Sequence, residues 1–297
     1  LSRVNFRTVL AGYLDPESVS RIERKKSKVA QRDIDIGYRA WKAEYWLGEH
    51  GVHKARIADV FERAALERGL KTDISIRDED VLAGDGWFDF LVRCRATIGV
   101  EGGASVLDRN GEIKRGVEDY LKQYPQSSFE QTRRCCFPND DHKIGLACIS
   151  PRHLEACATE TCQFLIEGRY NDILVPWRDY IPIKKDYSNV AEALEVLTDH
   201  SKMRGITSTA YKEVVCSNRW TYEKFVDEIE ETIIQPAELA PRMNPRLRQL
   251  LIRGALKLND LLNWQFIRTE AWLFAGKQRA KLARLVYYFL IRLRGAS

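Results

Sequence analysis

The chain has 297 residues and a formal net charge of +5, and 44% of its residues are hydrophobic. That length and apolar content suffice for one large or two modest packed domains. There is no signal peptide and no apolar run of the ~18 residues that a membrane-spanning helix needs, which argues against a membrane span. Seven cysteines, an odd number without a Cys-x-x-Cys pair, argue against a disulfide framework and a zinc site, and favour the reducing cytoplasm.

The first hundred residues alternate between strand and helix patterns. Apolar side chains spaced among charges predict a helix over 16–30, and the alternating sequence over 33–38 predicts a strand. The other expected elements are a strand over 4–10, a helix over 53–69, a strand over 72–77, a helix over 87–94 and a strand over 96–100. Such alternation is typical of an α/β fold with a parallel sheet.

Two basic residues in this region are candidates for binding an anion. Arg39 stands at the carboxyl end of the strand expected over 33–38, the edge at which open α/β sheets bind ligands. Lys54 is expected in the first turn of the helix over 53–69, where a cation opposes the helix dipole. Lys54 is therefore either an ordinary exposed lysine or a charge needed for an anion.

The glycine-rich segment 99–105 is expected to be a flexible turn. Gly102 and Gly103 would let the backbone approach a phosphate or a sugar closely, although a tight turn with positive φ explains them equally well. The segment is neither Gly-x-Gly-x-x-Gly nor a P-loop. Helices over 116–124 and 128–135, the second with capping-box spacing, are expected to form an insertion between sheet elements.

The stretch 145–188 is the strongest candidate for a functional site. An apolar run over 144–149 leads to Ser150, a good helix N-cap, and to Pro151, which suits the first helical position. The short helix that begins there is followed by the continuous apolar run 162–166, as expected for a strand buried on both faces.

Three polar residues follow this helix start. Arg152, His153 and Glu155 would lie near the free backbone N–H groups of the first turn and a half. That setting suits an anion or a sugar hydroxyl. Helices over 188–197, 201–215 and 221–234 are expected to form the outer layer of a doubly wound domain.

Several short motifs in this half of the chain form a recognisable series. They are Ser150-Pro151-Arg152, Leu154-Glu155-Ala156, the buried strand, Tyr180-Ile181-Pro182 and Lys185-Asp186. The series resembles the carboxyl-terminal half of GT-B glycosyltransferases, in the bacterial group 1 branch similar to spore-maturation glycosyltransferase-like proteins. The resemblance covers about residues 30–230.

The resemblance implies a Rossmann-like doubly wound parallel sheet and a metal-independent glycosyltransferase without a cofactor. Its co-substrate would be a nucleotide-diphosphate sugar, and its acceptor an unknown polysaccharide, lipid or protein. The donor-binding residues that the resemblance implies are Glu155 on the ribose, Arg39 and Lys54 on the diphosphate, and Gly102 and Gly103 in the cleft. The helix start adds Ser150, Arg152 and His153 as candidates beside them. Because the chain begins at Leu1 without a methionine, we expect a fragment that lacks the acceptor-binding amino-terminal half, and no catalytic base can be named.

Two departures from the family pattern support an alternative function. Glu160 stands where the family has a small residue or glycine, and Ala147 stands where many retaining relatives carry a glutamate. The alternative is a catalytically inactive glycosyltransferase-like scaffold that binds a nucleotide or a partner. A metal-dependent alternative depends on Asp33-Ile34-Asp35, which matches an Asp-x-Asp metal-binding motif. The sequence Asp140-Asp141-His142 is an equally weak candidate for a metal site.

The composition changes after Pro236. Residues 242–297 hold twelve Lys or Arg and two acidic residues, so this segment alone makes the chain basic. We therefore expect an interdomain segment over 1–32, a nucleotide-sugar-binding domain over 33–235 and a basic amphipathic helical extension over 236–297. Aromatic residues among the charges suit an anionic membrane surface, which would make the protein peripheral on the inner face of the membrane. Packing against the missing half is the alternative, and nucleic acid is a poorer one, because no nucleic-acid-binding motif accompanies the charge.

Overall fold

The computed structural model describes residues 8–234, so the basic extension and residues 1–7 lie outside the described part of the chain. The chain divides into two units after Val226, and the sheet and its surrounding helices belong to the first unit. Within residues 8–234, no helix combines the length and the apolar character that crossing a bilayer requires.

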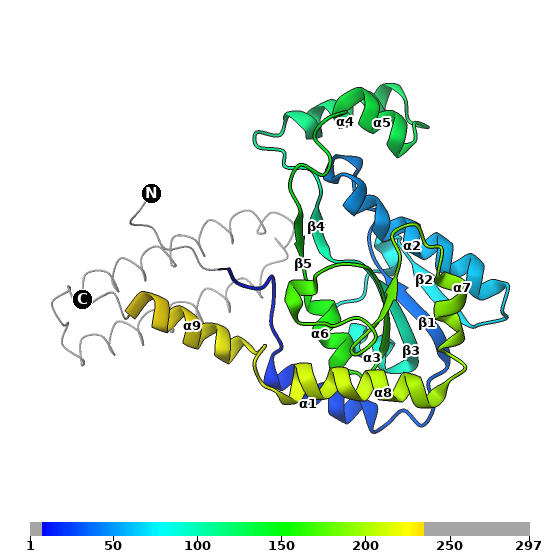
Figure 1. The fold of residues 1–297 in the computed structure, drawn as a ribbon, viewed down its shortest axis with the longest axis vertical. Helices are drawn as coiled ribbons and strands as arrows, with labels where there is room; N and C mark the ends of the chain where they lie inside the picture. Colours follow the sequence, from blue (N-terminus) through cyan, green and yellow to red (C-terminus); the bar gives the residue numbers. More distant parts are fainter. Residues whose placement is uncertain (1–7, 235–297) are drawn as a thin grey trace, which may run out of the picture. The chain divides into compact units, whose positions relative to one another are not determined.

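A sheet of five parallel strands forms the centre of this unit (Figure 1). In spatial order the strands are β2 (Thr72–Ser75), β1 (Ile34–Arg39), β3 (Cys94–Gly99), β6 (Cys162–Ile166) and β7 (Ile181–Ile183). Every residue of β6 is buried, as its apolar sequence predicts for a strand covered on both faces. The predicted α/β fold with a Rossmann-like parallel sheet is confirmed.

Helices pack on both faces of the sheet and form two apolar layers. One layer contains α1 (Pro16–Lys26), α3 (Asp85–Arg93), α6 (Pro151–Ala158) and the π-helical turn Tyr211–Cys216. The other contains α2 (Glu49–Leu66), α7 (Val190–Glu195) and α8 (His200–Ala210). The last described helix, α9, spans Tyr222–Ile234. Side chains of β6 alternate between the layers, with Leu165 in the first and Phe164 and Ile166 in the second.

The predicted insertion is present between β3 and β6. An antiparallel ribbon of β4 (Gly102–Ala104) and β5 (Leu146–Cys148) carries α4 (Glu112–Gln123) and α5 (Phe129–Cys136) (Figure 1). The two helices share a small apolar core that includes Val117 and Phe129. Ser128 and Gln131 form the predicted capping box at the start of α5.

Three sequence predictions about local structure are wrong. Helix α2 begins at Glu49 instead of at residue 53, because Gly48, at φ +80°, ends the 3-10 turn Tyr45–Leu47 and leads directly into the helix. Lys54 therefore lies in the second turn, where the unfavourable interaction of its charge with the helix dipole that was expected for the first turn does not apply. The supposed flexible turn over 99–105 contains strand β4, and the strand expected over 4–10 is absent from its described residues 8–10.

Glu160, one of the two departures from the family pattern, ends α6 in the left-handed conformation at φ +51°. That conformation costs a non-glycine residue roughly 1–2 kcal/mol. The carboxylate of Glu160 pairs with Nζ of Lys26 on α1 at 2.5 Å, which offsets part of that cost. The glutamate is thus compatible with this turn.

Candidate functional site

The candidate site is a pocket of about 210 Å³ at the carboxyl ends of β1 and β3. From β1 the chain crosses to β2 on one side, and β3, β6 and β7 follow on the other side, so the strand order reverses between β1 and β3. Doubly wound sheets bind ligands at such a point, because the connecting loops on either side diverge and leave a crevice. Tyr38 and Arg39 from β1, residues 97–99 from β3 and Val100 directly after β3 line the pocket.

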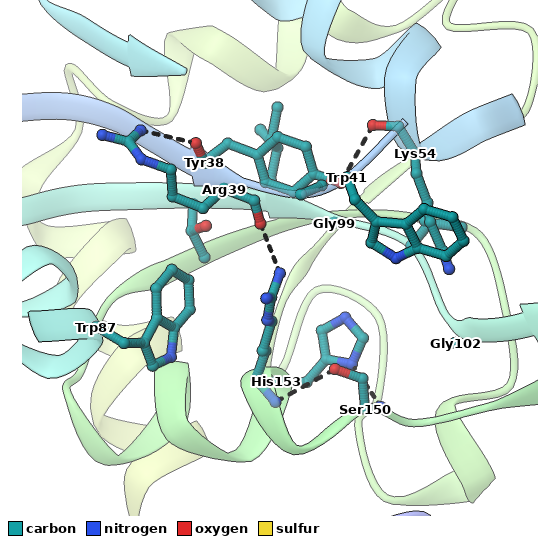
Figure 2. A pocket seen from close by; sticks show the side chains of 14 residues that line it. Tyr38, Arg39, Trp41, Lys54, Trp87, Gly99, Gly102, Ser150 and His153 are labelled. Carbon is teal, nitrogen blue, oxygen red and sulfur yellow. Dashed lines mark hydrogen bonds between the residues drawn. The ribbon is translucent and has the colours of Figure 1, made fainter. Parts of the chain in front are cut away.

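Arg39 borders the pocket, but its guanidinium is bonded within the protein. Nη2 pairs with Oδ1 of Asp73 at 2.7 Å, and Nη1 donates to the carbonyls of Asp73 and Tyr38. The guanidinium also lies 4.4 Å from the centroid of the Phe90 ring. In Figure 2 it turns back toward the Tyr38 carbonyl. Its positive charge is therefore already compensated by Asp73.

Lys54 faces the pocket from α2 without a carboxylate partner among the described residues. Its Nζ lies 5.5 Å from the centroid of the Trp41 ring, which is a cation–π contact. Burial, reinforced by repulsion from Arg152, lowers the pKa of Lys54 below its ordinary value. Lys54 is thus a cation with an unmet preference for a negative charge.

The start of α6 brings a second cation to the pocket. Ser150 is the N-cap and its Oγ accepts the backbone N–H of Arg152, as the Ser-Pro spelling predicts. Arg152 donates from Nη1 to the Arg39 carbonyl at 2.6 Å, and its guanidinium lies 5.2 Å from the Trp87 ring centroid. No carboxylate among the described residues pairs with Arg152.

His153 lines the same pocket and is 5% exposed. Its Nδ1 accepts the backbone N–H of Ser150 at 3.1 Å, which completes a capping box (Figure 2). Burial, followed by repulsion from Arg152, lowers the pKa of His153 to about 3. The imidazole is therefore neutral at physiological pH.

Glu155 does not line the pocket, whereas Arg39, Lys54, Ser150, Arg152 and His153 do. Its Oε2 accepts Nε1–H of Trp87 at 2.8 Å, and Trp87 forms part of the pocket wall. Burial raises the pKa of Glu155, against the opposing effect of this hydrogen bond. Its second oxygen, Oε1, has no hydrogen bond within the described residues.

Only one of the two candidate glycines borders the pocket. Gly102 lies in its wall. Gly103, at φ +121°, faces the other strand of the ribbon, where a Cβ would lie 1.6 Å from the Leu146 carbonyl oxygen. Gly103 is therefore required by the β4–β5 pairing rather than by the pocket.

The acidic motifs considered for a metal lie away from the pocket. Asp33 pairs with Arg93, and Asp35 pairs with Arg95, near the amino end of β1. Asp141 accepts the backbone N–H of Glu49 at the start of α2. In the part of the chain from 8 to 234, no group of three His, Cys, Asp or Glu side chains is arranged to hold a metal ion.

Sequence reasoning missed the aromatic walls of the pocket. Trp41 is 42% exposed and lies two residues after β1. Because the carboxyl end of that strand was already expected to border the site, the position of Trp41 in the sequence could have identified it as a lining residue. Trp87 arrives from α3, and no local sequence signal marks it. The described lining of the pocket contains basic, aromatic and neutral polar side chains and no Asp or Glu, so it is suited to an anion.

No protein-family model and no curated protein matches the chain. Among solved structures, it is similar to HepE from Anabaena in complex with UDP-glucose, with a TM-score of 0.38 and 10% identity, covering 75% of this chain and 54% of that one. It is also similar to TarM, with a TM-score of 0.34 and 10% identity, covering 68% of this chain and 35% of that one. The chain spans about half the length of HepE and about a third of TarM. The α/β assignment therefore depends on the strand order and the two apolar layers observed in this chain.

Proposed function

We propose that this chain binds a nucleotide-diphosphate sugar and serves as the donor-binding half of a glycosyltransferase. The observation that supports the proposal most is the pair of basic side chains, Lys54 and Arg152, in a pocket without Asp or Glu at the point where the strand order reverses. Lys54 is half-buried without an acidic partner among the described residues, which costs folding free energy, and a bound anion offsets that cost.

Sugar transfer explains why fixed cations would face the phosphates. An acceptor hydroxyl forms a new bond to the anomeric carbon while the bond from that carbon to the diphosphate oxygen breaks. The electron pair of the broken bond goes to the diphosphate, which gains negative charge, and the proton of the acceptor hydroxyl goes to a base from outside this pocket. Cations and helix N–H groups already directed at that oxygen stabilise the transition state. Lys54, Arg152 and the start of α6 at Ser150 would supply them, and the transfer would need no metal.

The role of Arg39 differs in this proposal from the one that the family resemblance implies, whereas the role of Glu155 stays the same. Arg39, already paired with Asp73, holds Arg152 through its carbonyl and does not itself bind phosphate. Glu155 would still reach the ribose through Oε1 while Oε2 stays with Trp87. Trp41 offers an exposed ring at the mouth of the pocket on which a base could stack.

Release of nucleoside diphosphate from UDP-, GDP- and ADP-glucose tests the proposal. The full chain, with and without EDTA, is expected to hydrolyse one of the donors, with water in place of the acceptor, and Arg152→Met is expected to slow this release by at least about tenfold. Glu155→Gln is expected to weaken binding of that donor but not of inorganic pyrophosphate. Turnover that is unchanged in Arg152→Met, or that is lost in EDTA, would contradict the proposed mechanism.

The inactive scaffold remains a second candidate because of one observation. No Asp or Glu lines the described pocket, so these residues provide no carboxylate base for an acceptor hydroxyl. A scaffold predicts micromolar binding of one donor, lost in Arg152→Met, without release of nucleoside diphosphate. Turnover above the solvent background would exclude it.

A further inference from the structure

We propose that His153 is a specificity-determining residue of this pocket, whose ring is fixed in one neutral tautomer so that Nε2–H donates a hydrogen bond to an oxygen of the bound diphosphate. The ligand class rests on the proposed function. The tautomer and the direction of the donor rest on the geometry of α6 and β3.

The capping hydrogen bond determines the tautomer. A backbone N–H can only donate, so the Nδ1 atom that faces the Ser150 N–H at 3.1 Å must carry a lone pair. A neutral imidazole with a bare Nδ1 carries its proton on Nε2. The same contact that starts the helix therefore makes Nε2 a donor.

The surroundings of the ring keep it in this orientation. Tyr170 packs against the imidazole edge to face, with ring centroids 5.1 Å apart. Gln163 donates from Nε2 to the His153 backbone carbonyl at 3.2 Å, which holds that part of α6 against β6. Rotating the ring by half a turn would place a C–H group against the Ser150 N–H and would break the capping box.

The space in front of Nε2 is open because residue 99 is a glycine. A Cβ at Gly99 would lie 3.2 Å from Nε2 of His153 and 2.9 Å from Cδ2 of Leu165. Nε2 has no hydrogen-bond partner within the described residues, and its residue lines the pocket together with Gly99 (Figure 2). A donor is thus held beside Lys54 and Arg152 with room for a ligand oxygen.

The uncharged donor of His153 orients a bound anion, which the two cations alone do not. Lys54 and Arg152 attract any anion, whereas Nε2–H selects an oxygen with a lone pair at one place near the end of β3. We therefore expect His153 to affect phosphate oxygens strongly and the attraction of simple halide ions little.

Two substitutions of His153 distinguish its role as a hydrogen-bond donor to the ligand from its role in the capping box of α6. Both Gln and Glu at this helix position can accept the N–H of the N-cap residue, so His153→Gln and His153→Glu both preserve the capping box. The free group facing the pocket is then an amide that can donate in one variant and a carboxylate oxygen in the other.

Calorimetry with inorganic pyrophosphate on the full chain measures the difference. We expect His153→Gln to bind within about threefold of the wild type, and His153→Glu to bind at least about thirtyfold more weakly, with unfolding midpoints of both variants close to each other. In ¹⁵N spectra of the wild type at pH 7, we expect the Nδ1 of His153 to be unprotonated and the Nε2 to be protonated. Undiminished binding by His153→Glu, or a proton on Nδ1, would overturn the inference.

The failure of this inference can be distinguished from failure of the proposed function. If Lys54→Met weakens pyrophosphate binding and His153→Glu does not, the role of His153 is wrong and the anion pocket stands. If neither pyrophosphate nor any donor binds the wild type, both the pocket assignment and the role of His153 are wrong.

Discussion

Lys54 on α2 and Arg152 on α6 face one pocket, and neither pairs with a carboxylate among the described residues. Each lies near a tryptophan ring instead, Lys54 near Trp41 and Arg152 near Trp87. The neighbouring Arg39, by contrast, is paired with Asp73. The pocket thus holds two cationic side chains without a carboxylate paired to them among the described residues, which is typical of a binding site.

Replacing Lys54 by methionine is expected to stabilise the protein while impairing its pocket. The change removes a partly buried charge that Arg152 repels, so the free energy of unfolding should rise by about 0.5–1 kcal/mol. Pyrophosphate affinity should fall by at least about tenfold. Urea unfolding and calorimetry measure the two effects. Lys122→Met, at an exposed lysine paired with Asp119, should change neither, and a Lys54→Met variant that binds normally would contradict the site.

Arg39→Met is expected to show the opposite pattern. The change removes the ion pair with Asp73 and two hydrogen bonds to carbonyls, so the free energy of unfolding should fall by about 1–3 kcal/mol. The Arg39 carbonyl that accepts from Arg152 remains. Pyrophosphate affinity should therefore change by less than about threefold. A loss of tenfold or more without a loss of stability would instead make Arg39 a direct phosphate ligand.

Glu155→Gln is expected to stabilise the protein at alkaline pH and not at acid pH. The pKa of Glu155 is raised by burial, so between its unfolded and folded pKa values the native state binds more protons than the unfolded state, and the wild type loses stability as pH rises through the folded pKa. Glutamine does not titrate and can still accept the Trp87 N–H. The variant should gain up to about 1 kcal/mol in urea unfolding at pH 8 and nothing at pH 4. An equal gain at both pH values would show that the charge is not the cause.

Two buried histidines should make the protein sensitive to mild acid. Burial lowers the pKa of His53 to about 4 and that of His153 to about 3. Below pH 6.5 the unfolded chain binds protons that the native state does not, so their contribution to stability is complete above pH 6.5 and declines as pH falls toward 4. The slope is at most about 1.4 kcal/mol per pH unit for each histidine.

The histidine prediction can be checked by urea unfolding at pH 7, 6 and 5. His53→Gln, which can still form a hydrogen bond with the Tyr187 hydroxyl, should remove part of the decline, because burial also lowers the pKa of His50 and of His153. The exposed His200 on α8 provides the matched substitution, His200→Gln, which should leave the decline as in the wild type. A decline that His53→Gln does not alter would assign the acid sensitivity to other groups.

The parts of the fold that the sequence predicted are those that local chemistry determines. Ser150 and Pro151 start α6 because one caps the helix and the other suits its first turn, and the apolar run 162–166 is of the kind expected for a strand buried on both faces. The parts that were missed depend on residues far apart in the chain. Asp73 reaches Arg39 from a strand 34 residues away, and Trp87 reaches Glu155 across 68 residues.

The position of the pocket was predicted better than its contacts. The carboxyl end of β1 and the start of α6 were both expected to bind the donor, and they do line one pocket. Which cations remain unpaired there could not be derived, because it depends on where each acid of the chain packs. Lys54 was expected at the start of a helix and reaches the pocket from the second turn instead.

The most direct test of the site is the affinity of the full chain for UDP-, GDP- and ADP-glucose in the wild type and in the double variant Lys54→Met/Arg152→Met. Calorimetry should show micromolar binding of one donor by the wild type and by Lys122→Met, and at least about a hundredfold loss in the double variant. Binding that the double variant retains, or a wild type that binds none of the three donors, would contradict the assignment of this pocket to a nucleotide-diphosphate sugar.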